Sequence, residues 1–465
     1  MNVRIKFLGG AQSVTGSKYL VEIDDHKVLV DCGLFQGLKE LRQRNWADFP
    51  VDPKSIDSIV ITHAHIDHIG YLPKLYKEGF RGPIYCTAAT KDLAKIMLLD
   101  SAKLQEEEAD YAAKKGYSKH DKPEPLYSVE DVENTLPFIE GYRYNQRIKI
   151  SDRLAIKFHD AGHILGSAIT ELYIQGDKMR KKIVFSGDIG RYGKPILRNP
   201  AAIKDADFLL IESTYGNKVN PTVDPIDMLA DAINTAFAKN GCILIPAFAV
   251  GRTQTLLYYI RKLLEQKRIP SVPVYVDSPM AINVTALYQR HSSFHTLGES
   301  DSLYESVFEF PNLNYYRSQS DSVQINNIRS HAIIISSSGM CNGGRILHHL
   351  FHRLPRANDT VLFTGFQAEG TRGRKILEGD KKIKIFGEEV DVRCNVQHIN
   401  GLSAHADKEE LLRWLGNFRE NPKNTFIIHG ELENSKIFAQ TITDKFGWNT
   451  HVPDYMETYD LFKGI

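Results

Sequence analysis

The chain has 465 residues, of which 42% are hydrophobic and 25% are charged, with 58 Lys and Arg against 57 Asp and Glu. A chain of this length can hold two or three domains and needs no disulfide or metal simply to build a core. The net charge of +1 excludes a generally basic protein, so any contact with a polyanion must be made by a local patch.

The five cysteines are scattered and form no C-x-x-C pair. We therefore expect buried, reduced thiols rather than a disulfide framework. Residues 1–10 contain no long apolar segment, and the longest apolar runs, such as 242–250, are far shorter than the roughly 20 residues of a membrane-spanning helix. These features predict a cytoplasmic protein that makes no contact with a membrane.

The first part of the chain predicts short strands, because β-branched and alternating residues are separated by turns with Gly and Asp. Residues 87–115 have a helical and strongly charged pattern, and Ser128 with Asp131 resembles a capping box that opens another helix. The strands predicted as far as residue 185 are 3–8, 19–23, 27–30, 58–62, 148–150, 154–158, 168–173 and 182–185.

From Asp207 onward, strands alternate with segments of helical spacing, which is typical of a parallel α/β unit. After Val390 short strands and helices resume, and Gly447 is placed to end a final helix. No fixed-period repeat is present. The sequence thus predicts one α/β domain interrupted by another. The predicted strands of this part are 207–211, 242–245, 274–276, 333–335, 361–363 and 426–428, with the final helix at 432–446.

A dense group of metal-ligand residue types follows the predicted strand 58–62, in the sequence T-H-A-H-I-D-H. Imidazole and carboxylate groups suit Zn²⁺ and similar divalent ions. A loop that leaves a strand can turn residues two apart toward one point, so His63 and His65 could share an ion. Asp67 and His68 could then face a neighbouring ion.

Further candidate ligands follow later strands, where loops commonly carry functional sites. His163 stands in D-A-G-H and Asp188 in S-G-D. Taken alone, each is more often a structural turn residue, but together with the first motif each becomes a ligand candidate. His429 ends the strand 426–428, and its position alone does not decide between the two interpretations.

These motifs resemble the metallo-β-lactamase superfamily. Three further matches make the chain similar to its β-CASP nucleases: Glu212 in I-E-S-T-Y-G, His405 in G-L-S-A-H-A-D and His429 in I-I-H-G-E. The resemblance covers nearly the whole chain and implies an α/β fold, a metallo-β-lactamase αββα sandwich with an inserted α/β β-CASP domain. The implied divisions are 1–214 and 388–465 for the sandwich and 215–387 for the insertion.

The resemblance also implies a ligand set for two Zn²⁺ ions, with Mn²⁺ as the alternative. Asp188 would bridge the two ions. Asp31, in V-D-C-G, would bind no ion itself but would orient the ligands through hydrogen bonds. By periodicity alone Asp31 is a plain turn residue. One ion would be bound by His63, His65 and His163, and the other by Asp67, His68 and His429.

The implied reaction is hydrolysis of RNA phosphodiester bonds, with cleavage inside single-stranded RNA. Two ions about 3.5–4 Å apart clamp a phosphate and lower the pKa of a water toward 7. Asp67 would orient that water, and His405, held by Glu212, would protonate the leaving oxygen. The structural alternatives are a helix-capping Glu212 and a His405 that merely precedes the cap pair Asp407 and Glu410.

Substrate contacts are predicted from Gly- and Ser-rich loops at 251–253, 336–339, 343–345 and 365–367. Each loop follows a predicted strand and opens a helix, where backbone amides favour phosphate, although tight packing explains any one of them. Together the loops resemble the nucleic-acid-binding face of the family, which points to Arg252, Ser338 and Arg345. No Walker A or G-x-G-x-x-G motif is present, so nucleoside triphosphates and dinucleotides are not favoured.

Three other functions stay open. A small-molecule ester or thioester hydrolase explains the ligands equally well, but not the large insertion or the Glu212–His405 pair. A DNA nuclease is disfavoured because the DNA-processing branch typically has an apolar residue at the position of His429. A binding subunit without chemistry would be expected to have lost ligands. The sequence does not decide between internal and terminal cutting, nor the oligomeric state, a homodimer included.

Overall fold

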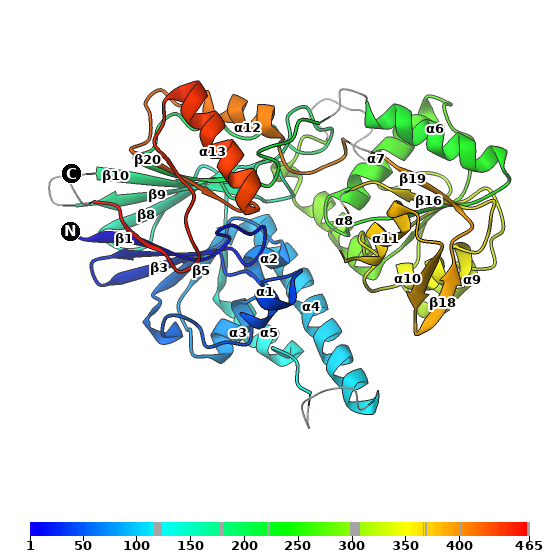
Figure 1. Ribbon diagram of the computed structural model, residues 1–465, viewed down its shortest axis with the longest axis horizontal. Coiled ribbons are helices and arrows are strands. Elements are labelled where there is room, and N and C mark those ends of the chain that lie inside the picture. The colour runs from blue at the N-terminus through cyan, green and yellow to red at the C-terminus, as the bar shows by residue number, and fades with distance from the viewer. Residues whose placement is uncertain are drawn as a thin grey trace. The chain divides into compact units, whose positions relative to one another are not determined.

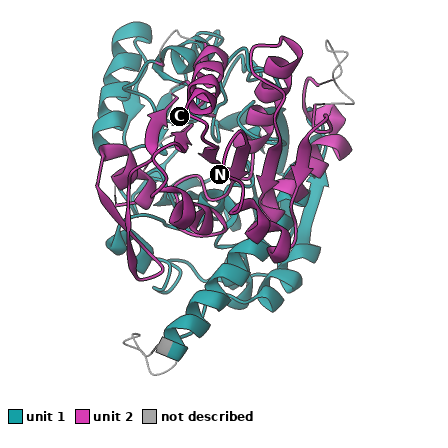
Figure 2. Cartoon of the chain, turned by 90° about the vertical axis from the view of Figure 1, so that its right-hand side faces the viewer, with its two compact units in different colours: residues 1–219, 405–465 teal, residues 220–404 magenta. Residues whose placement is uncertain are grey.

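The structure is a computed structural model that describes residues 1–115, 123–176, 180–220, 224–297, 307–365, 367, 370–399 and 401–462. Cα packing divides the chain into two units, which Figure 2 shows in different colours. Unit 1 comprises Met1–Val219 and His405–Ile465, and unit 2 comprises Asn220–Ala404.

Unit 1 contains two seven-stranded sheets, ordered β22-β1-β2-β3-β4-β5-β6 and β21-β20-β11-β10-β9-β8-β7. The strands of the first sheet are β1 (Val3–Gly9), β2 (Lys18–Ile23), β3 (His26–Val30), β4 (Ser58–Val60), β5 (Ile84–Thr87), β6 (Ile139–Tyr142) and β22 (Thr458–Asp460). Those of the second sheet are β7 (Arg147–Lys149), β8 (Leu154–Asp160), β9 (Ala168–Gln175), β10 (Arg180–Phe185), β11 (Phe208–Glu212), β20 (Asn424–Ile428) and β21 (Thr450–His451).

The strand β11 shows why the two sheets stack. Phe208 and Leu210 point into the core between the sheets, whereas Leu209 and Ile211 pack on the opposite face. A strand buried on both faces is hydrophobic at nearly every position. The helices α12 (Lys408–Leu415) and α13 (Leu432–Phe446) cover that outer face, as Figure 1 shows.

The remaining helices of unit 1 lie on the side of the first sheet away from the second (Figure 1). Unit 1 therefore has four layers in the order helix, sheet, sheet, helix. These helices are α1 (Lys39–Gln43), α2 (Ile66–Ile69), α3 (Leu72–Lys77), α4 (Ala88–Lys115) and α5 (Val129–Thr135).

Parallel pairing positions the functional loops of unit 1. The strands β3 and β4 run parallel in the first sheet, and β10, β11 and β20 run parallel in the second. Parallel neighbours end at the same edge of a sheet, so the segments that follow them lie together. The strand β11 ends in Glu212, and each of the other four strands is followed within a few residues by a residue predicted to belong to the metal site.

Unit 2 contains a six-stranded sheet, ordered β14-β13-β15-β12-β16-β19, in which every pair is parallel. Its strands are β12 (Ile243–Pro246), β13 (Val274–Asp277), β14 (Leu313–Tyr315), β15 (Ile333–Ser336), β16 (Thr360–Phe363) and β19 (Asn395–His398). A separate antiparallel pair is formed by β17 (Lys382–Ile385) and β18 (Glu388–Asp391). The helices of the unit are α6 (Pro225–Ala238), α7 (Arg252–Glu265), α8 (Pro279–Arg290), α9 (Gln319–Ile325), α10 (Ile346–Arg353) and α11 (Arg372–Glu378).

The unit boundaries lie a short distance from the divisions expected from the sequence. The strand β19 belongs to the segment expected in the last part of the sandwich, but it pairs in parallel with β16. Because this pairing adds β19 to the sheet of unit 2, the chain returns to unit 1 at His405 rather than at residue 388. The first crossing lies at residues 219 and 220.

Several local predictions are confirmed. Reciprocal capping boxes form between Ser128 and Asp131 and between Asp407 and Glu410. The last helix ends at Gly447, whose φ of 68° is left-handed, a conformation that glycine adopts without strain. All five cysteines are buried and unpaired. Within the described ranges, no helix has the length and apolar character needed to cross a bilayer.

Candidate metal centre

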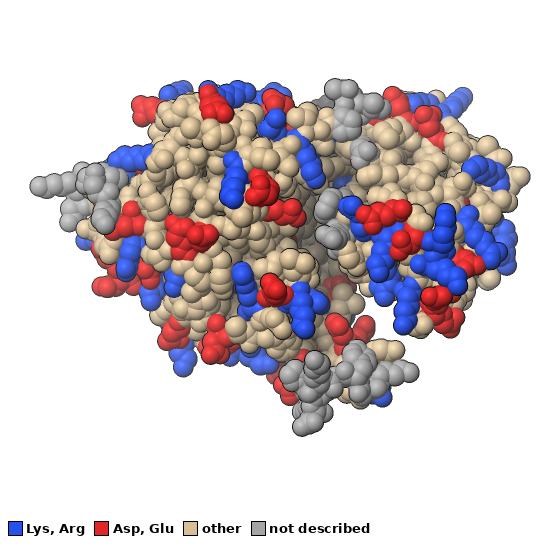
Figure 3. All heavy atoms as spheres, in the orientation of Figure 1, with Lys and Arg blue, Asp and Glu red and all other residues tan. Residues whose placement is uncertain are grey.

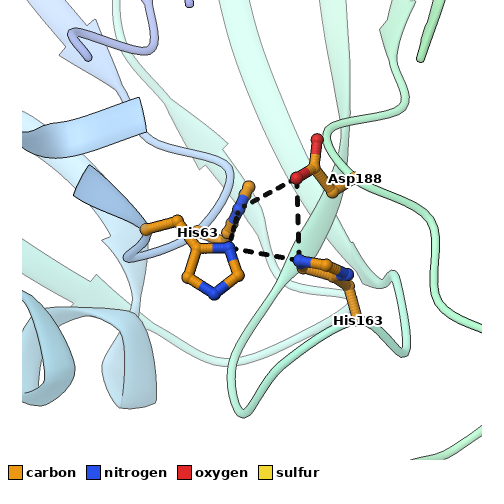
Figure 4. Close-up of side chains that lie close together, drawn as sticks. His63, His163 and Asp188 are labelled. Carbon is orange, nitrogen blue, oxygen red and sulfur yellow. Dashed lines mark hydrogen bonds and ion pairs between the residues drawn. The ribbon is translucent and has the colours of Figure 1, made fainter. Parts of the chain in front are cut away.

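Four predicted ligands converge in unit 1, with ligand atoms that all lie within 4.8 Å of one another: His63, His65, His163 and Asp188. Nδ1 of His65 lies 3.1 Å from Nε2 of His63 and 3.2 Å from Nε2 of His163. Oδ2 of Asp188 lies 3.4 Å from His63 Nε2 and 3.6 Å from His163 Nε2. Figure 4 shows the side chains of His63, His163 and Asp188 pointing toward one another.

Asp67, His68 and His429 form a neighbouring group. Nε2 of His429 lies 3.2 Å from both Nε2 of His68 and Oδ2 of Asp67. The second oxygen of Asp188, Oδ1, lies 3.5 Å from Nε2 of His68. Asp188 therefore turns one carboxylate oxygen toward each group, so the structure brings all seven predicted ligands together.

The spacing of the ligand nitrogens fits shared metal ions. A tetrahedral zinc with Zn–N distances of 2.0–2.1 Å places two nitrogens about 3.3 Å apart. The closest nitrogen pairs of the two groups lie 3.1–3.2 Å apart. Oδ1 of Asp188 is buried and accepts no hydrogen bond from the described residues. A buried, unsatisfied carboxylate oxygen among imidazoles is the environment that a divalent cation completes.

Asp31 fixes the orientation of His68. Oδ2 of Asp31 lies 2.8 Å from Nδ1 of His68, and its Oδ1 accepts a 2.8 Å hydrogen bond from the backbone N–H of Thr62. When the ring is neutral, a proton held on Nδ1 leaves the lone pair of Nε2 directed toward Asp67 and His429. The φ of Asp31 is 59°, which is uncommon outside glycine and best tolerated by Asp and Asn.

Two threonines that sequence reasoning missed contact ligand histidines. The Thr62 hydroxyl lies 3.1 Å from Nδ1 of His63, and the Thr214 hydroxyl lies 3.0 Å from Nδ1 of His429. Thr62 directly precedes the H-x-H motif, and Thr214 stands in the E-S-T motif. Hydroxyl-bearing residues beside candidate ligands are the signal that could have found them.

Burial and the neighbouring carboxylates shift the pKa values of the ligand histidines in opposite directions. Burial lowers the pKa of His63 and lowers that of His65 to about 3, so both rings are neutral at neutral pH. Burial also disfavours charge on His68, but the carboxylates of Asp188, Asp31 and Asp67 outweigh it and raise its pKa to about 10. This ring is therefore charged at neutral pH in the metal-free site, and it must release a proton to bind a metal ion. Burial would raise the pKa of Asp67, yet His68 and His429 hold it far below the usual range.

Beside the ligands, His405 is paired with Glu212. Nδ1 of His405 lies 3.1 Å from Oε2 of Glu212, which is completely buried. Oε1 of Glu212 accepts a 2.6 Å hydrogen bond from the backbone N–H of Ile189. Burial disfavours the charged ring of His405, but the adjacent carboxylate outweighs it and raises the pKa to about 9. The imidazole ring centroid lies 4.4 Å from that of His163.

The three predicted substrate contacts lie in unit 2, where each is engaged within the unit. Arg345 donates through NH1 to Oδ1 of Asp277 at 2.6 Å and to Tyr316 O, and through NH2 to Arg317 O. The Ser338 hydroxyl donates to Gly343 O at 3.2 Å and accepts from the N–H of Asn342. Arg252 donates to Leu402 O. Phe366, in the predicted loop 365–367, lies outside the described residues.

Comparison with known families finds three matches along the chain. The metallo-beta-lactamase superfamily domain matches residues 20–205, the Beta-Casp domain matches 253–376, and the Zn-dependent metallo-hydrolase RNA specificity domain matches 389–453. The predicted fold class, a metallo-β-lactamase fold with an inserted β-CASP domain, is confirmed.

Individual proteins show the same relationship. The chain is 35% identical to Ribonuclease TTHA0252 of Thermus thermophilus, over 93% of this chain and 94% of the relative. It is 30% identical to Transcription termination factor FttA of Cenarchaeum symbiosum, over 99% of this chain and 71% of the relative. A crystal structure of a protein of unknown function from Enterococcus faecalis has the same fold, with a TM-score of 0.56, 12% identity and coverage of 99% and 100%.

The predictions of a metal-dependent nuclease and of its family are both confirmed by these relatives. The chain belongs to the β-CASP family of the metallo-β-lactamase superfamily.

Proposed function

We propose that this protein is a zinc-dependent ribonuclease that hydrolyses phosphodiester bonds within single-stranded RNA through two metal ions. The observation that carries the proposal is the shared carboxylate of Asp188 between two ligand groups, beside the Glu212–His405 pair. The match to the Thermus ribonuclease along 93% of the chain supports RNA as the substrate.

In this proposal His63, His65 and His163 hold one ion, and His68, His429 and Asp67 hold the other. Asp188, whose two oxygens face the two ligand groups, would contribute to holding both ions. When bound, two such ions supply Lewis acidity at the phosphate and lower the pKa of a water toward 7. Zinc is favoured by the mixture of imidazole and carboxylate ligands, and manganese is the alternative.

Asp67 orients the attacking water. Its side chain is 17% exposed, whereas the side chains of Asp188 and His68 are each 2% exposed. Asp67 therefore lies where the ligand group meets solvent. Its low pKa keeps the carboxylate ionised at neutral pH and ready to accept a hydrogen bond from the water.

His405 protonates the departing ribose oxygen. Because Glu212 binds Nδ1, the proton to be transferred is carried by Nε2. A pKa of about 9 keeps the ring charged at neutral pH, as an acid catalyst requires. Such acid catalysis typically contributes about 10²- to 10⁴-fold to the rate.

The test incubates purified protein and zinc with a short end-labelled single-stranded RNA, beside the matched DNA and RNA duplex. We expect RNA fragments that disappear with a chelator and return with added zinc, and internal cutting would show as fragments of intermediate size. Asp67→Ala is the inactive control. Intact RNA from protein that holds two zinc ions would contradict the proposal and favour a small-molecule hydrolase.

The predicted homodimer stays a prediction, which mass photometry can test.

A further inference from the structure

Unit 2 has a hollow of about 280 Å³ beside α11 and β17. Its walls combine the start of α11, one strand of the separate antiparallel pair and the loop before α10. The lining residues are Asn342, Gly370, Arg372, Lys375, Ile383 and Lys384. Three of the six are basic and none is acidic or aromatic.

Among the described residues, no carboxylate forms an ion pair with the basic side chains of the hollow. Arg372 donates through Nε to Lys384 O at 2.9 Å and through NH1 to Asn342 O at 3.1 Å. These backbone contacts hold the guanidinium in place without cancelling its charge. Lys375 and Lys384 are exposed, and neither ammonium makes an ion pair with any described residue.

Neighbouring cations on the same two elements are paired. Arg374, on α11, lies 2.6 Å from Glu378, and Lys382, on β17, lies 3.1 Å from Glu389. Unpaired and paired cations therefore occur on each element. On α11 and β17, the cations without an ion pair among the described residues are the three that line the hollow, Arg372, Lys375 and Lys384.

The local charge departs from that of the whole chain. Residues 370–385 contain six basic and two acidic residues, while the complete chain has a net charge of +1. Figure 3 shows Lys and Arg side chains gathered over the part of unit 2 where Figure 1 labels α10, α11 and β18. A local basic patch on a neutral protein is where a polyanion would bind.

We propose that this hollow binds a backbone phosphate of the RNA substrate, as an anchoring site additional to the metal centre. The inference rests on the proposed ribonuclease function. One guanidinium and two ammonium groups are phosphate ligands, and phosphate contacts fix the position of a strand without reading its bases. The described residues that line the hollow include no aromatic ring for base stacking, so their chemistry suits the repeated phosphates of a strand better than a free nucleotide.

The proposal predicts binding that is independent of RNA sequence and sensitive to salt. Each phosphate contact made by a lysine adds about one unit to the slope of log affinity against log salt concentration. Loss of the two unpaired lysines should therefore weaken the binding of RNA to a similar degree for every sequence. It should also make that binding less dependent on salt concentration.

The test measures binding of a fluorescein-labelled 24-nucleotide polyuridine to the full chain by anisotropy, in chelator so that no cleavage occurs, at several KCl concentrations. The variant Lys375→Ala/Lys384→Ala is compared with Arg374→Ala/Lys382→Ala. Each removes two positive charges, one from α11 and one from β17, so net charge is matched. Thermal melting of both variants checks that unit 2 remains folded.

We expect the first variant to bind about tenfold more weakly at 0.1 M salt with a slope smaller by about one to two units, and the paired control to change less than about threefold. Equal effects of the two variants would overturn the proposal, because charge alone would then suffice. Unchanged binding of the first variant would also overturn it.

A second arm distinguishes the sources of phosphate. Uridine 5′-monophosphate is titrated into the wild-type chain and the Lys375→Ala/Lys384→Ala variant. If loss of the two lysines weakened binding of the mononucleotide but left RNA affinity unchanged, the hollow would be a nucleotide site. That result would overturn the proposal that it binds an RNA strand. Cleavage by the zinc-loaded wild-type chain is scored separately, so failure of the ribonuclease function is distinguishable from failure of the anchoring site.

Discussion

Nδ1 of His405 lies 3.1 Å from Oε2 of Glu212, although the two residues are 193 positions apart in the chain. The backbone of the same segment pairs with the loop after β10, since the N–H of Ala406 donates to Ile189 O at 2.8 Å. Ile189 in turn donates to Glu212. One small network therefore fixes the acid, its partner carboxylate and the loop that carries Asp188.

We expect Glu212→Gln to move the alkaline limit of activity to lower pH. His405 must be protonated to act as an acid, and the ring is protonated below its pKa of about 9. Without the carboxylate, burial dominates and the pKa falls. The measurement is kcat between pH 6 and pH 10 with zinc content recorded at each point. An unchanged alkaline limb in the zinc-replete variant would contradict the role of the pair.

We expect His405→Ala to keep both metals and to lose about 10²- to 10⁴-fold in kcat, because His405 is not among the predicted ligands and its loss removes only the proton donor. Zinc content is measured by elemental mass spectrometry, and kcat is measured on single-stranded RNA. Turnover like that of wild type in the metal-replete variant would rule out the acid role.

We expect Asp31→Asn to weaken zinc binding by about 10- to 100-fold, because the charged acceptor that orients His68 is lost. Asn is the appropriate substitution, since it tolerates the left-handed φ of 59° at this position. Affinity is measured by competition with a chromophoric chelator. The melting temperature in zinc-free buffer serves as the control for folding, and unchanged affinity in a folded variant would contradict the orienting role.

Site residues that are close together in the sequence could be predicted from local motifs, whereas those far apart could not. His63, His65, Asp67 and His68 stand within six positions, so their chemistry is visible in one loop. His429 reaches His68 from 361 positions away, and no local pattern indicates that contact. Only the family resemblance supplied it.

The fold shows the same division. Strands with strong alternation or apolar runs, such as β1 and β11, were predicted nearly to their ends. The pair β17 and β18 was missed because its charged outer positions give little apolar signal. The position of β19 in the sheet of unit 2 depends on tertiary pairing with β16, which periodicity cannot reveal.

Arg345, predicted to contact substrate, has a buried partner that its local motif does not indicate. The sequence placed it after two glycines and favoured contact with substrate, but its guanidinium pairs with Asp277 at 2.6 Å. Asp277 is completely buried at the end of β13 and also contacts His349 Nε2 at 2.7 Å and the Ser322 hydroxyl. NH1 of Arg345 therefore donates to a buried carboxylate that lies 68 positions away in the sequence.

We expect Arg345→Ala to lower the free energy of unfolding by about 1–3 kcal/mol, because Asp277 would lose one of its partners while remaining buried. Urea denaturation measures the change. Arg317→Ala, which removes an exposed contact with Asn283, is the control. Unchanged stability together with weaker RNA binding would restore Arg345 as a substrate contact.

We expect Lys18→Met to raise the melting temperature near pH 7. Lys18 is buried over the rings of Phe35 and Tyr71, and burial lowers its pKa from 10.5 to about 8. Between pH 8 and 10.5 the unfolded chain binds more protons, so the stability of the wild type rises with pH. Below pH 8 the full cost of burying the charge is present.

The advantage of Lys18→Met should therefore be largest near neutral pH and should shrink as the pH approaches 10.5. Melting temperatures of both proteins across this range test the expectation. A difference that does not vary with pH would show that the substitution acts through packing rather than through the buried charge.

The most direct test of the two-metal account titrates zinc into the metal-free protein and measures single-turnover cleavage of end-labelled single-stranded RNA at each step. The account predicts that cleavage reaches its plateau at two zinc ions per chain and is absent from Asp67→Ala at every ratio. A plateau at one zinc ion, or intact RNA from protein with two bound ions, would contradict it.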